Sequence, residues 1–329
     1  MEKKDRQFIV ALAALAAAGA GLLYLLAPAL LDPAWVRRFH HSAQDSEVVG
    51  VYLSPLFWGL LASVFVLERL IPARRAQGIV SLGLVQDGVY FVLILLFRIL
   101  LLSLYVKLLR WLYTEHLSFL TLESVASWPG WAKGVTAVAI TDFLGWFHHV
   151  VRHKVPAFWR LHAVHHSQKE LNIFTDLRYH PFEYLITQTI LFIPMFMFGA
   201  AFPVLLGYAF FQQVYTKFYH GNVRSDLGPL RFLLVTPQSH RIHHSASAEH
   251  QDKNFAVVFS VWDWLFGTQF AGHHEYPETG VDDAAFPHER SVRGLGLLQA
   301  PWRQFLYPLK SRRERAPLAG AAPSASAGP

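Results

Sequence analysis

Long apolar runs separated by short charged segments dominate the hydrophobic pattern of this chain. The runs cover residues 8–31, 51–67, 82–106, 131–151 and 184–214. A helix needs about 20 predominantly apolar residues to cross a hydrocarbon core about 30 Å thick. The last run contains Pro194, Gly199 and Pro203, which favours two shorter spans or a re-entrant hairpin. The pattern therefore predicts an all-α integral membrane protein, built as a bundle of four to six transmembrane helices.

Two of these runs have features of their own. The run 8–31 follows three basic residues and is longer than the roughly 7 to 15 apolar residues of a cleaved signal peptide. We therefore expect a retained signal anchor there. The run 82–106 is interrupted by Asp87 and Arg98. Charges at such positions face other helices or extend toward the membrane surface.

The lysines and arginines between the runs predict how the bundle is oriented. Basic residues concentrate on the cytoplasmic side of a membrane protein. With the N-terminus inside, the outer loops hold only Arg37, Arg38, Lys107, Arg110 and Lys133. The same orientation brings the histidine-rich stretches 148–180 and 220–250 to the inner face. We expect these stretches to form a helical cap that faces the cytosol, in a bacterial inner membrane or an endoplasmic reticulum.

Composition supports a membrane protein and narrows its chemistry. Hydrophobic residues make up 53% of the chain and charged residues only 16%. The net charge of +6 comes from basic residues beside apolar runs, so we expect a membrane surface and no nucleic acid as the partner. The absence of cysteine excludes disulfides, cysteine-ligated metals and thiol nucleophiles. Eighteen histidines against 23 carboxylates point to a nitrogen-ligated metal site.

The first histidine cluster ends the run 131–151. His149 and His153 are four residues apart, so on a helix they share one face, one turn apart, as two ligands of one metal would. His148 points to another side. Asp142 lies on the face of His149 and His153 within about 20°. It is either an acceptor that orients an imidazole or a polar residue in helix packing.

Two further clusters repeat the spacing H-x-x-H-H. One comprises His162, His165 and His166, and the other comprises His240, His243 and His244. On a helix, three residues in this spacing point to one side, within an arc of about 100°. Two adjacent imidazoles diverge too far to bind one ion easily, so the repeated pair favours two metals close together. Thr236 and Pro237 supply an N-cap and a first helical residue for the last cluster.

The remaining histidines are weaker candidates. His220 stands alone after the run 184–214, and His180 precedes a proline and has no partner at helical spacing. The others are treated as surface or interfacial: His40, His41, His116, His148, His250, His273, His274 and His288.

The donor set restricts the class of reaction. Imidazoles without thiolates suit Fe, Zn, Cu or Ni, and eight or nine of them exceed the capacity of one ion. Two redox metals beneath an apolar bundle favour dioxygen activation for attack on an unactivated C–H bond of a molecule dissolved in the bilayer.

At these residues the sequence resembles the fatty acid hydroxylase and sterol desaturase superfamily of membrane di-iron oxygenases. The resemblance runs from Asp142 to Thr268. It departs from the usual pattern at Val150, where members often carry Arg, and at Trp146-Phe147, where Tyr-Trp is more usual. The motifs that carry the resemblance are Asp142-Phe143 with His149 and His153, Trp159 to Ser167, Asn172, Thr175, Arg178, His180, Pro181, His220 to Asn222, Thr236 to His244, Asp252, Asn254, and Trp262 to Thr268.

The resemblance implies a helical fold with a cytosol-facing cap, and O2-dependent hydroxylation or desaturation of a sterol-like or fatty-acyl lipid. It implies two Fe ions, replaceable by Zn in purified protein, and the following metal ligands: His149, His153, His162, His165, His166, His220, His240, His243 and His244. Catalytic or supporting candidates without an assigned role are Asp142, Asn172, Arg178 and Asp252. The segment Trp262 to Phe266 is equally well interpreted as an interfacial aromatic anchor.

The expected organisation has three parts. Residues 1–130 hold N-terminal transmembrane helices and loops, 131–270 hold the catalytic domain, and 271–329 form a C-terminal extension. Its tail, from Lys310 onward, has a composition typical of disorder. The chain has no flavin, haem-attachment or iron–sulfur motif, so an external electron-transfer protein is expected as a partner.

A histidine-rich membrane transporter or a zinc-dependent enzyme is the alternative. A transporter places its ionisable ligands near the middle of the bilayer, whereas these clusters lie beyond the ends of the runs. A zinc hydrolase keeps a glutamate base near its ligands, and neither H-x-x-H-H segment contains Glu. Both observations favour the oxygenase.

Overall fold

The computed structural model describes residues 55–78, 80–125, 127–198, 202–283, 286–288 and 296–309. The expected signal anchor at 8–31, the histidines His40 and His41, and the tail from Lys310 onward lie outside these residues.

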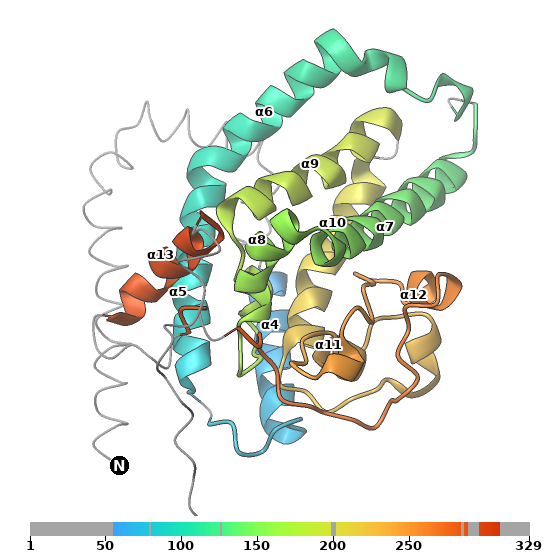
Figure 1. The fold of residues 1–329 in the computed structure, drawn as a ribbon. Coiled ribbons are helices and arrows are strands. Elements are labelled where there is room, and N and C mark those ends of the chain that lie inside the picture. Colours follow the sequence, from blue (N-terminus) through green and yellow to red (C-terminus); the bar gives the residue numbers. More distant parts are fainter. Residues whose placement is uncertain are drawn as a thin grey trace, which may run out of the picture.

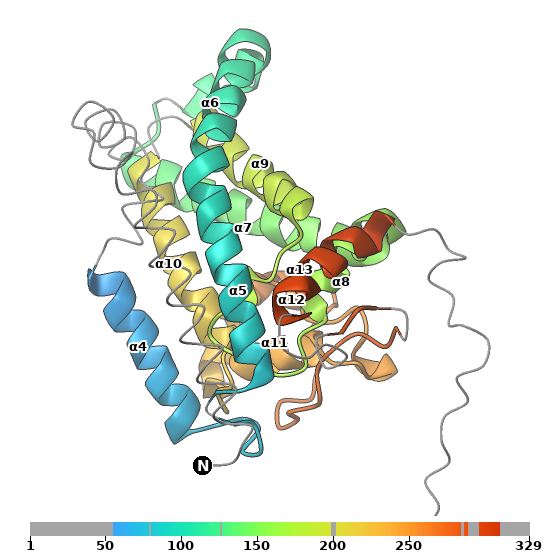
Figure 2. The same ribbon diagram turned by 90° about the vertical axis from the view of Figure 1, so that its left-hand side faces the viewer.

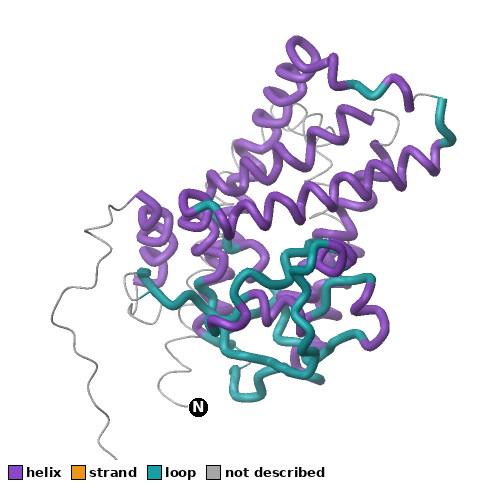
Figure 3. Tube along the Cα trace, turned by 45° about the vertical axis from the view of Figure 1, so that its right-hand side comes forward, coloured by secondary structure: helices purple, strands orange, loops and turns teal. Residues whose placement is uncertain are grey.

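The described part of the chain is helical, as the sequence predicts (Figure 1). Within it, β-pairing is limited to three isolated bridges, and Figure 3 draws only helices and loops. The α-helices are α4 (Pro55–Leu70), α5 (Leu82–Phe97), α6 (Ser103–Leu112), α7 (Gly130–Lys154), α8 (Pro156–His166), α9 (Pro181–Phe198), α10 (Phe202–His220), α11 (Pro237–His243), α12 (Val261–Leu265) and α13 (Gly296–Leu306).

Several helices correspond to apolar runs of the sequence. The run 82–106 begins at the N-cap Ser81, whose hydroxyl accepts from the Leu84 amide, and continues from α5 through π-helical turns into α6. The run 184–214 forms two helices, α9 and α10, with Pro194 inside α9. Within the described residues, no helix combines the length and the apolar content that crossing a membrane demands.

Proline and threonine set the helix boundaries around the histidine clusters. Val155 is extended and Pro156 begins α8, so the chain turns sharply between α7 and α8. Thr236 and Ser239 form a reciprocal capping box at the start of α11, with Pro237 as its first residue. The predicted N-cap of α11 is confirmed.

The long helices pack around α7. This helix contacts α8, α9 and α10, while α10 also lies against α4 and α11 (Figures 1 and 2). The loops, which Figure 3 colours teal, collect at one end of the described chain, where Figure 1 labels α11 and α12. Trp146 of α7, Tyr219 of α10 and Phe255 of the loop region belong to one buried cluster at that end. This apolar packing joins the loop region to the helices.

The charges inside the apolar run 82–106 contact other segments, as the sequence predicts. Asp87 is fully buried and accepts from the Arg178 Nε at 2.8 Å. Arg98 donates to Gln213 of α10 at 3.1 Å and lies over the ring of Tyr184. These polar contacts join α5 and the following π-helical turn to the segments that carry the histidines.

Candidate metal centre

Two helices joined by a sharp turn deliver the first histidines. On α7, His149 and His153 have ring centroids 5.2 Å apart, as residues one turn apart on one face do. On α8, His162 and His166 are also one turn apart, with their Nε2 atoms 3.2 Å from each other. The turn at Val155 folds α8 back so that these two pairs face one another.

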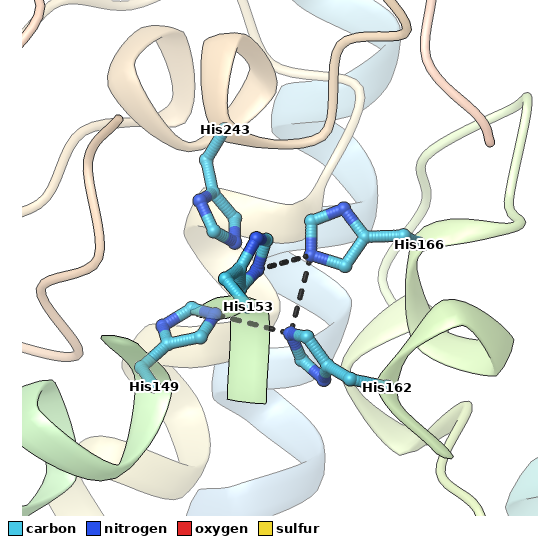
Figure 4. Close-up of side chains that lie close together, drawn as sticks. All are labelled: His149, His153, His162, His166 and His243. Atoms are coloured by element: carbon cyan, nitrogen blue, oxygen red, sulfur yellow. Dashed lines mark hydrogen bonds between the residues drawn. The ribbon is translucent and has the colours of Figure 1, made fainter. Parts of the chain in front are cut away.

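Five histidines form the first group (Figure 4). His149 and His153 come from α7, His162 and His166 from α8, and His243 from α11, and their ligand atoms all lie within 4.8 Å of one another. The Nε2 atoms of His149 and His162 are 3.1 Å apart, as are those of His153 and His166. The five rings therefore converge on one small volume.

Four histidines form the second group. His165 comes from α8, His220 from α10, and His240 and His244 from α11 and its C-cap. The Nε2 atom of His220 lies 3.1 Å from that of His165 and 2.8 Å from that of His240. The Nε2 atoms of His240 and His244 are 3.1 Å apart. All nine histidines for which the sequence predicts a ligand role are thus brought together.

The adjacent histidines separate between the two groups. His165 belongs to the second group and His166 to the first, and His244 and His243 divide in the same way. The two groups touch, since the rings of His166 and His244 are stacked with centroids 4.4 Å apart. Each H-x-x-H-H segment therefore contributes to two neighbouring sites.

Three of the outer ring nitrogens have backbone acceptors in the surrounding structure. His149 Nδ1 donates to the Phe255 carbonyl, His243 Nδ1 to the Lys253 carbonyl and His220 Nδ1 to the Thr216 carbonyl, at 2.7–2.8 Å. Such contacts fix the tautomer with the proton on Nδ1 and orient the ring. The Nε2 lone pairs then point into the two groups.

Glu183 is a functional residue that the sequence analysis missed. It lies in the first turn of α9, and its Oε1 accepts from His162 Nδ1 at 2.7 Å and from Arg152 Nη1 at 2.7 Å. Burial raises the pKa of this carboxyl, and the Arg152 charge opposes that rise. The available signal was a glutamate at the start of an otherwise apolar helix, where an anion faces the helix N-terminus.

Burial keeps the imidazoles neutral. Loss of hydration lowers the pKa of His220 and of His243 to about 3. The same cause lowers the pKa of His153, His166 and His244 well below its usual value. Neutral imidazole is the form that binds a metal.

The arrangement of lone pairs fits metal ions. Neutral His149 and His162 both carry their proton on Nδ1, so two lone pairs face each other across 3.1 Å. Only a cation between such lone pairs makes the contact attractive. Two ligands at right angles, each about 2.1 Å from an ion, are separated by about 3.0 Å, which agrees with this spacing. His243 Nε2 is buried and lacks a hydrogen-bond partner, as expected of a nitrogen that binds a metal.

Asp142 lies on the predicted face of α7, but its contacts are with other groups. Its carboxylate accepts from the Tyr208 hydroxyl at 2.5 Å, from Trp262 Nε1 at 2.8 Å, and from the amides of Val258 and Phe259. None of these partners is a histidine. The contacts favour the helix-packing interpretation of Asp142 over a role in orienting an imidazole.

Asn172 and Arg178 both contact Asp87. Asn172 Nδ2 donates to one carboxylate oxygen at 2.8 Å, and Arg178 Nε donates to the other at 2.8 Å. Arg178 Nη1 also donates to Ser167, the C-cap of α8, at 2.9 Å. These residues fix the segment that follows the histidines of α8.

Asp252 lies at the surface, where it pairs with Lys154 at 2.6 Å. The backbone φ of Asp252 is +59°, and that of Asn254 is +57°. These left-handed residues bend the segment that carries the Lys253 carbonyl, the acceptor of His243. Asp252 thus supports the shape of this loop.

The other histidines that the structure describes lie outside both groups. His180 donates to the Phe305 carbonyl at 3.0 Å, and His116 is exposed. His148 and His250 were expected to be surface or interfacial, and a surface position is wrong for both: they are 6% and 3% exposed. His148 is covered because α7 is surrounded by other helices. His250 is covered because its loop folds back onto Phe270.

The aromatic segment at α12 divides between the two interpretations given to it. Trp262 reaches inward to Asp142, and Asp263 accepts from Trp146 Nε1 at 3.0 Å. Leu265 and Phe266 are at least half exposed. The first part of the segment packs against α7, and the second part presents apolar side chains at the surface.

Comparisons with known proteins identify the part of the chain that holds both groups. Residues 134–268 match the family model described as fatty acid hydroxylase. The chain is 36% identical to alkylglycerol monooxygenase from Homo sapiens over 37% of its own length and 27% of that protein. It is 28% identical to ornithine lipid hydroxylase OlsE from Rhizobium tropici, over 57% of its own length and 54% of that protein.

A third relative, alkylglycerol monooxygenase from Caenorhabditis elegans, is 32% identical over 41% of this chain and 26% of that protein. The chain thus spans about half or less of the length of these relatives. No solved structure matches it. The family model and the relatives agree that residues 134–268, which hold both histidine groups, are similar to the fatty acid hydroxylase family.

Proposed function

We propose that this fatty acid hydroxylase domain belongs to a membrane-embedded di-iron oxygenase, which uses O2 to hydroxylate or desaturate a lipid. The observation that carries the proposal is the pair of touching imidazole groups. Within each group, Nε2 atoms that face one another are 3.1 Å apart, which is close to the separation of two ligands on one metal ion. The names of the relatives, which are lipid hydroxylases and monooxygenases, support the same class of reaction.

The proposal gives each histidine group one iron. His149, His153, His162, His166 and His243 would hold one ion, and His165, His220, His240 and His244 would hold the other. When bound, the two irons supply the redox chemistry for dioxygen activation, which no amino-acid side chain provides. Zinc suits the same all-nitrogen donors and would occupy them without redox activity.

The residues of the chain hold the ligands in place. Glu183 accepts the Nδ1 proton of His162 and is itself fixed by Arg152. Backbone carbonyls accept the Nδ1 protons of His149 and His243 from the opposite side. Because the rings are buried and held by these acceptors, water is excluded and the donor geometry does not have to be rebuilt when a metal binds.

Exposed apolar side chains support contact with a membrane. Trp58 and Val66 on α4, Leu104 and Trp111 on α6, and Phe211 on α10 are exposed large hydrophobic residues. Large apolar surfaces of this kind mark protein or membrane contacts. The helices would therefore lie in the bilayer, with the loop region of Figure 3 as the cap on the cytoplasmic face.

The positions of the histidines favour an oxygenase over a transporter. His153 is next to the last residue of α7, and His166 and His220 are the last residues of α8 and α10. A transport site lies near the middle of the bilayer within broken helices. A site at helix ends, beneath an apolar bundle, suits a reaction on a lipid that reaches the membrane surface.

The reaction also needs electrons from outside the chain. The sequence has neither cysteine for an iron–sulfur cluster nor a flavin or haem-attachment motif. A separate electron-transfer protein would supply the electrons, and an acidic carrier would suit the basic residues expected on the inner face.

Metal analysis and a labelled turnover test the proposal. Purified protein should contain close to two irons per chain, and the His243→Ala variant should contain fewer. With lipid extract, reductant and dioxygen labelled with heavy oxygen, the wild type should place label in a lipid if it hydroxylates, or remove two hydrogens if it desaturates. One zinc per chain that is unchanged in His243→Ala, with no lipid product, would contradict the proposal.

A further inference from the structure

A third group of metal-binding side chains lies outside the two groups just described. Asp226 follows α10, and His273 and His274 follow α12. We propose that these three residues form a separate site for a divalent transition-metal ion of the zinc type. The proposal does not depend on the reaction at the histidine centre.

The three side chains are already gathered. One ligand atom from each lies within 4.8 Å of the others, and the rings of His273 and His274 have centroids 4.0 Å apart. Ligands around one tetrahedral zinc are about 3.3 Å apart, so small rotations of the partly buried His273 ring and the exposed His274 ring would close the site. The residues line a surface cavity of about 380 Å³, which leaves room for the ion and its water ligands.

The orientation of Asp226 is fixed by its own loop. Its Oδ1 accepts from the Gly228 amide at 3.0 Å, which holds the carboxylate in place. The guanidinium of Arg231 is 3.9 Å from Oδ2, and the two side chains are 30% and 28% exposed, so this long ion pair competes weakly for the carboxylate. Arg224, which also lines the cavity, lies over the ring of Tyr276 with its guanidinium carbon 4.7 Å from the ring centre.

The ligand atoms of this third group indicate which metal ion it would bind. Two imidazole nitrogens with one carboxylate suit zinc and its first-row neighbours. Magnesium and calcium prefer oxygen ligands throughout. A second possible group, Glu249, His250 and Glu275, has a single nitrogen donor, and its histidine lies 3.3 Å from Glu275 and 3.8 Å from Glu249 as an ion pair would. The site with two histidines is therefore the better match for zinc.

The proposed ion would fasten two loops that hold the same residue of α11. The Gln238 amide donates to the Ser225 carbonyl at 3.1 Å. The Gln238 side chain donates to the carbonyls of Gly272 and Glu275, each at 3.1 Å. Asp226 adjoins the first loop contact, and His273 and His274 lie between the other two. An ion bridging these loops would clamp the start of the helix that carries His240 and His243.

Zinc binding to the full chain tests the proposal. Protein whose histidine centre has been loaded with metal is dialysed against zinc, and bound metal is counted for wild type, His274→Ala and Asp226→Asn. We expect the wild type to bind one more zinc per chain than either variant, with equal metal in the centre. His116→Ala is the matched control, because His116 is exposed and belongs to no group, and it should bind as the wild type does.

Hydrogen exchange supplies a second readout. Zinc should slow amide exchange in residues 223–228 and 272–276 of the wild type and have no such effect in His274→Ala. Equal zinc binding by wild type and His274→Ala would overturn the proposal. So would loss of the extra zinc in His250→Ala with its retention in His274→Ala, because the ion would then belong to the neighbouring group.

Discussion

His162 donates its Nδ1 proton to Glu183 at 2.7 Å, although the two residues are 21 positions apart on different helices. Both side chains are buried, at 1% and 2% exposure, so water does not compete for this contact. The same carboxylate oxygen accepts from Arg152. One oxygen therefore orients a ring of the five-histidine group and neutralises a buried guanidinium.

Replacement of Glu183 should weaken metal binding in a protein that still folds. Loss of a carboxylate that orients a ligand typically lowers metal affinity about 10–100-fold, and we expect Glu183→Ala to fall in this range. Glu183→Gln keeps an acceptor and should lose less. Iron content after dialysis against a graded chelator measures the effect. Glu249→Gln is the control, because Glu249 is exposed; a Glu183→Ala protein with wild-type iron retention would refute the positioning role.

Adjacent histidines on α7 should differ in their effect on metal. His149 belongs to the five-histidine group, whereas His148 belongs to neither group. Alanine at His165, His166, His243 or His244 should lower the bound metal and abolish activity, because each of these residues belongs to one of the two groups. His148→Ala should keep a metal content near that of the wild type. The variant should be less stable, because the substitution removes a buried ring. Full metal content and turnover in any of the four ligand variants would show that the assignment of that residue is wrong.

Substitution of Asp142 should change the stability of the fold more than its metal content. Asn at this position presents an amide nitrogen to donors such as Trp262 Nε1 and the Phe259 amide, which would leave buried donors unsatisfied. Each such group costs about 1–3 kcal/mol, so Asp142→Asn should lower the free energy of unfolding by about 2 kcal/mol or more. Thermal unfolding of metal-loaded protein measures this change. Unchanged stability with reduced iron would instead support a role in orienting an imidazole.

The buried and the exposed ion pair should differ strongly in their contribution to the free energy of unfolding. Asp87 and Arg178 are both fully buried, so Asp87→Ala leaves an uncompensated charge and should cost about 3–5 kcal/mol. Lys154 and Asp252 are 56% and 42% exposed, so Asp252→Ala should cost about 1 kcal/mol or less. Denaturation midpoints of the two variants provide the comparison. Equal losses would contradict the difference in burial on which this prediction rests.

Acid should destabilise the metal-free protein. Burial lowers the pKa of His220 and His243 to about 3, whereas the unfolded chain protonates histidine near pH 6.5. Between these values the unfolded state binds more protons, so stability falls as the pH drops below about 6.5 and is independent of these groups above it. Each histidine contributes up to about 1.4 kcal/mol per pH unit.

Urea midpoints of chelator-treated protein near neutral pH and at about pH 5 test this dependence. The midpoint should be lower in acid. His243→Ala should show a shallower dependence, because it removes one of the shifted groups. A midpoint that is equal or higher at about pH 5 would show that the rings are not held neutral in the fold.

The sequence predicts the helices and the donor set because both depend on local spacing. The runs 131–151 and 184–214 appear as α7 and as the pair α9 and α10, since apolar periodicity and prolines act within a few turns. The spacing H-x-x-H-H places His162, His165 and His166 on one side of α8 for the same reason.

Contacts between distant segments could not be read from local spacing. Glu183 reaches His162 across the irregular segment between α8 and α9, whose path depends on Asp87 and its partners. The position of Asp142 on α7 was predicted correctly, but its partners lie in a loop near Phe259 that periodicity does not place. His250 was assigned to the surface because a loop histidine gives no signal of what folds over it.

The distribution of the nine imidazoles over α7, α8, α10 and α11 has a consequence for biogenesis. If the proposed ions bind, a polypeptide emerging from the ribosome would complete neither ion site until α11 has been made, since His240, His243 and His244 are the last of the nine ligand candidates along the chain. Free energy from ion capture is therefore released only after the distant helices have met, and it reinforces the finished arrangement over partial ones. With the proposed irons, metal retention would act as a checkpoint on assembly, and shortage of the ion would leave chains open to proteolytic clearance before any turnover begins.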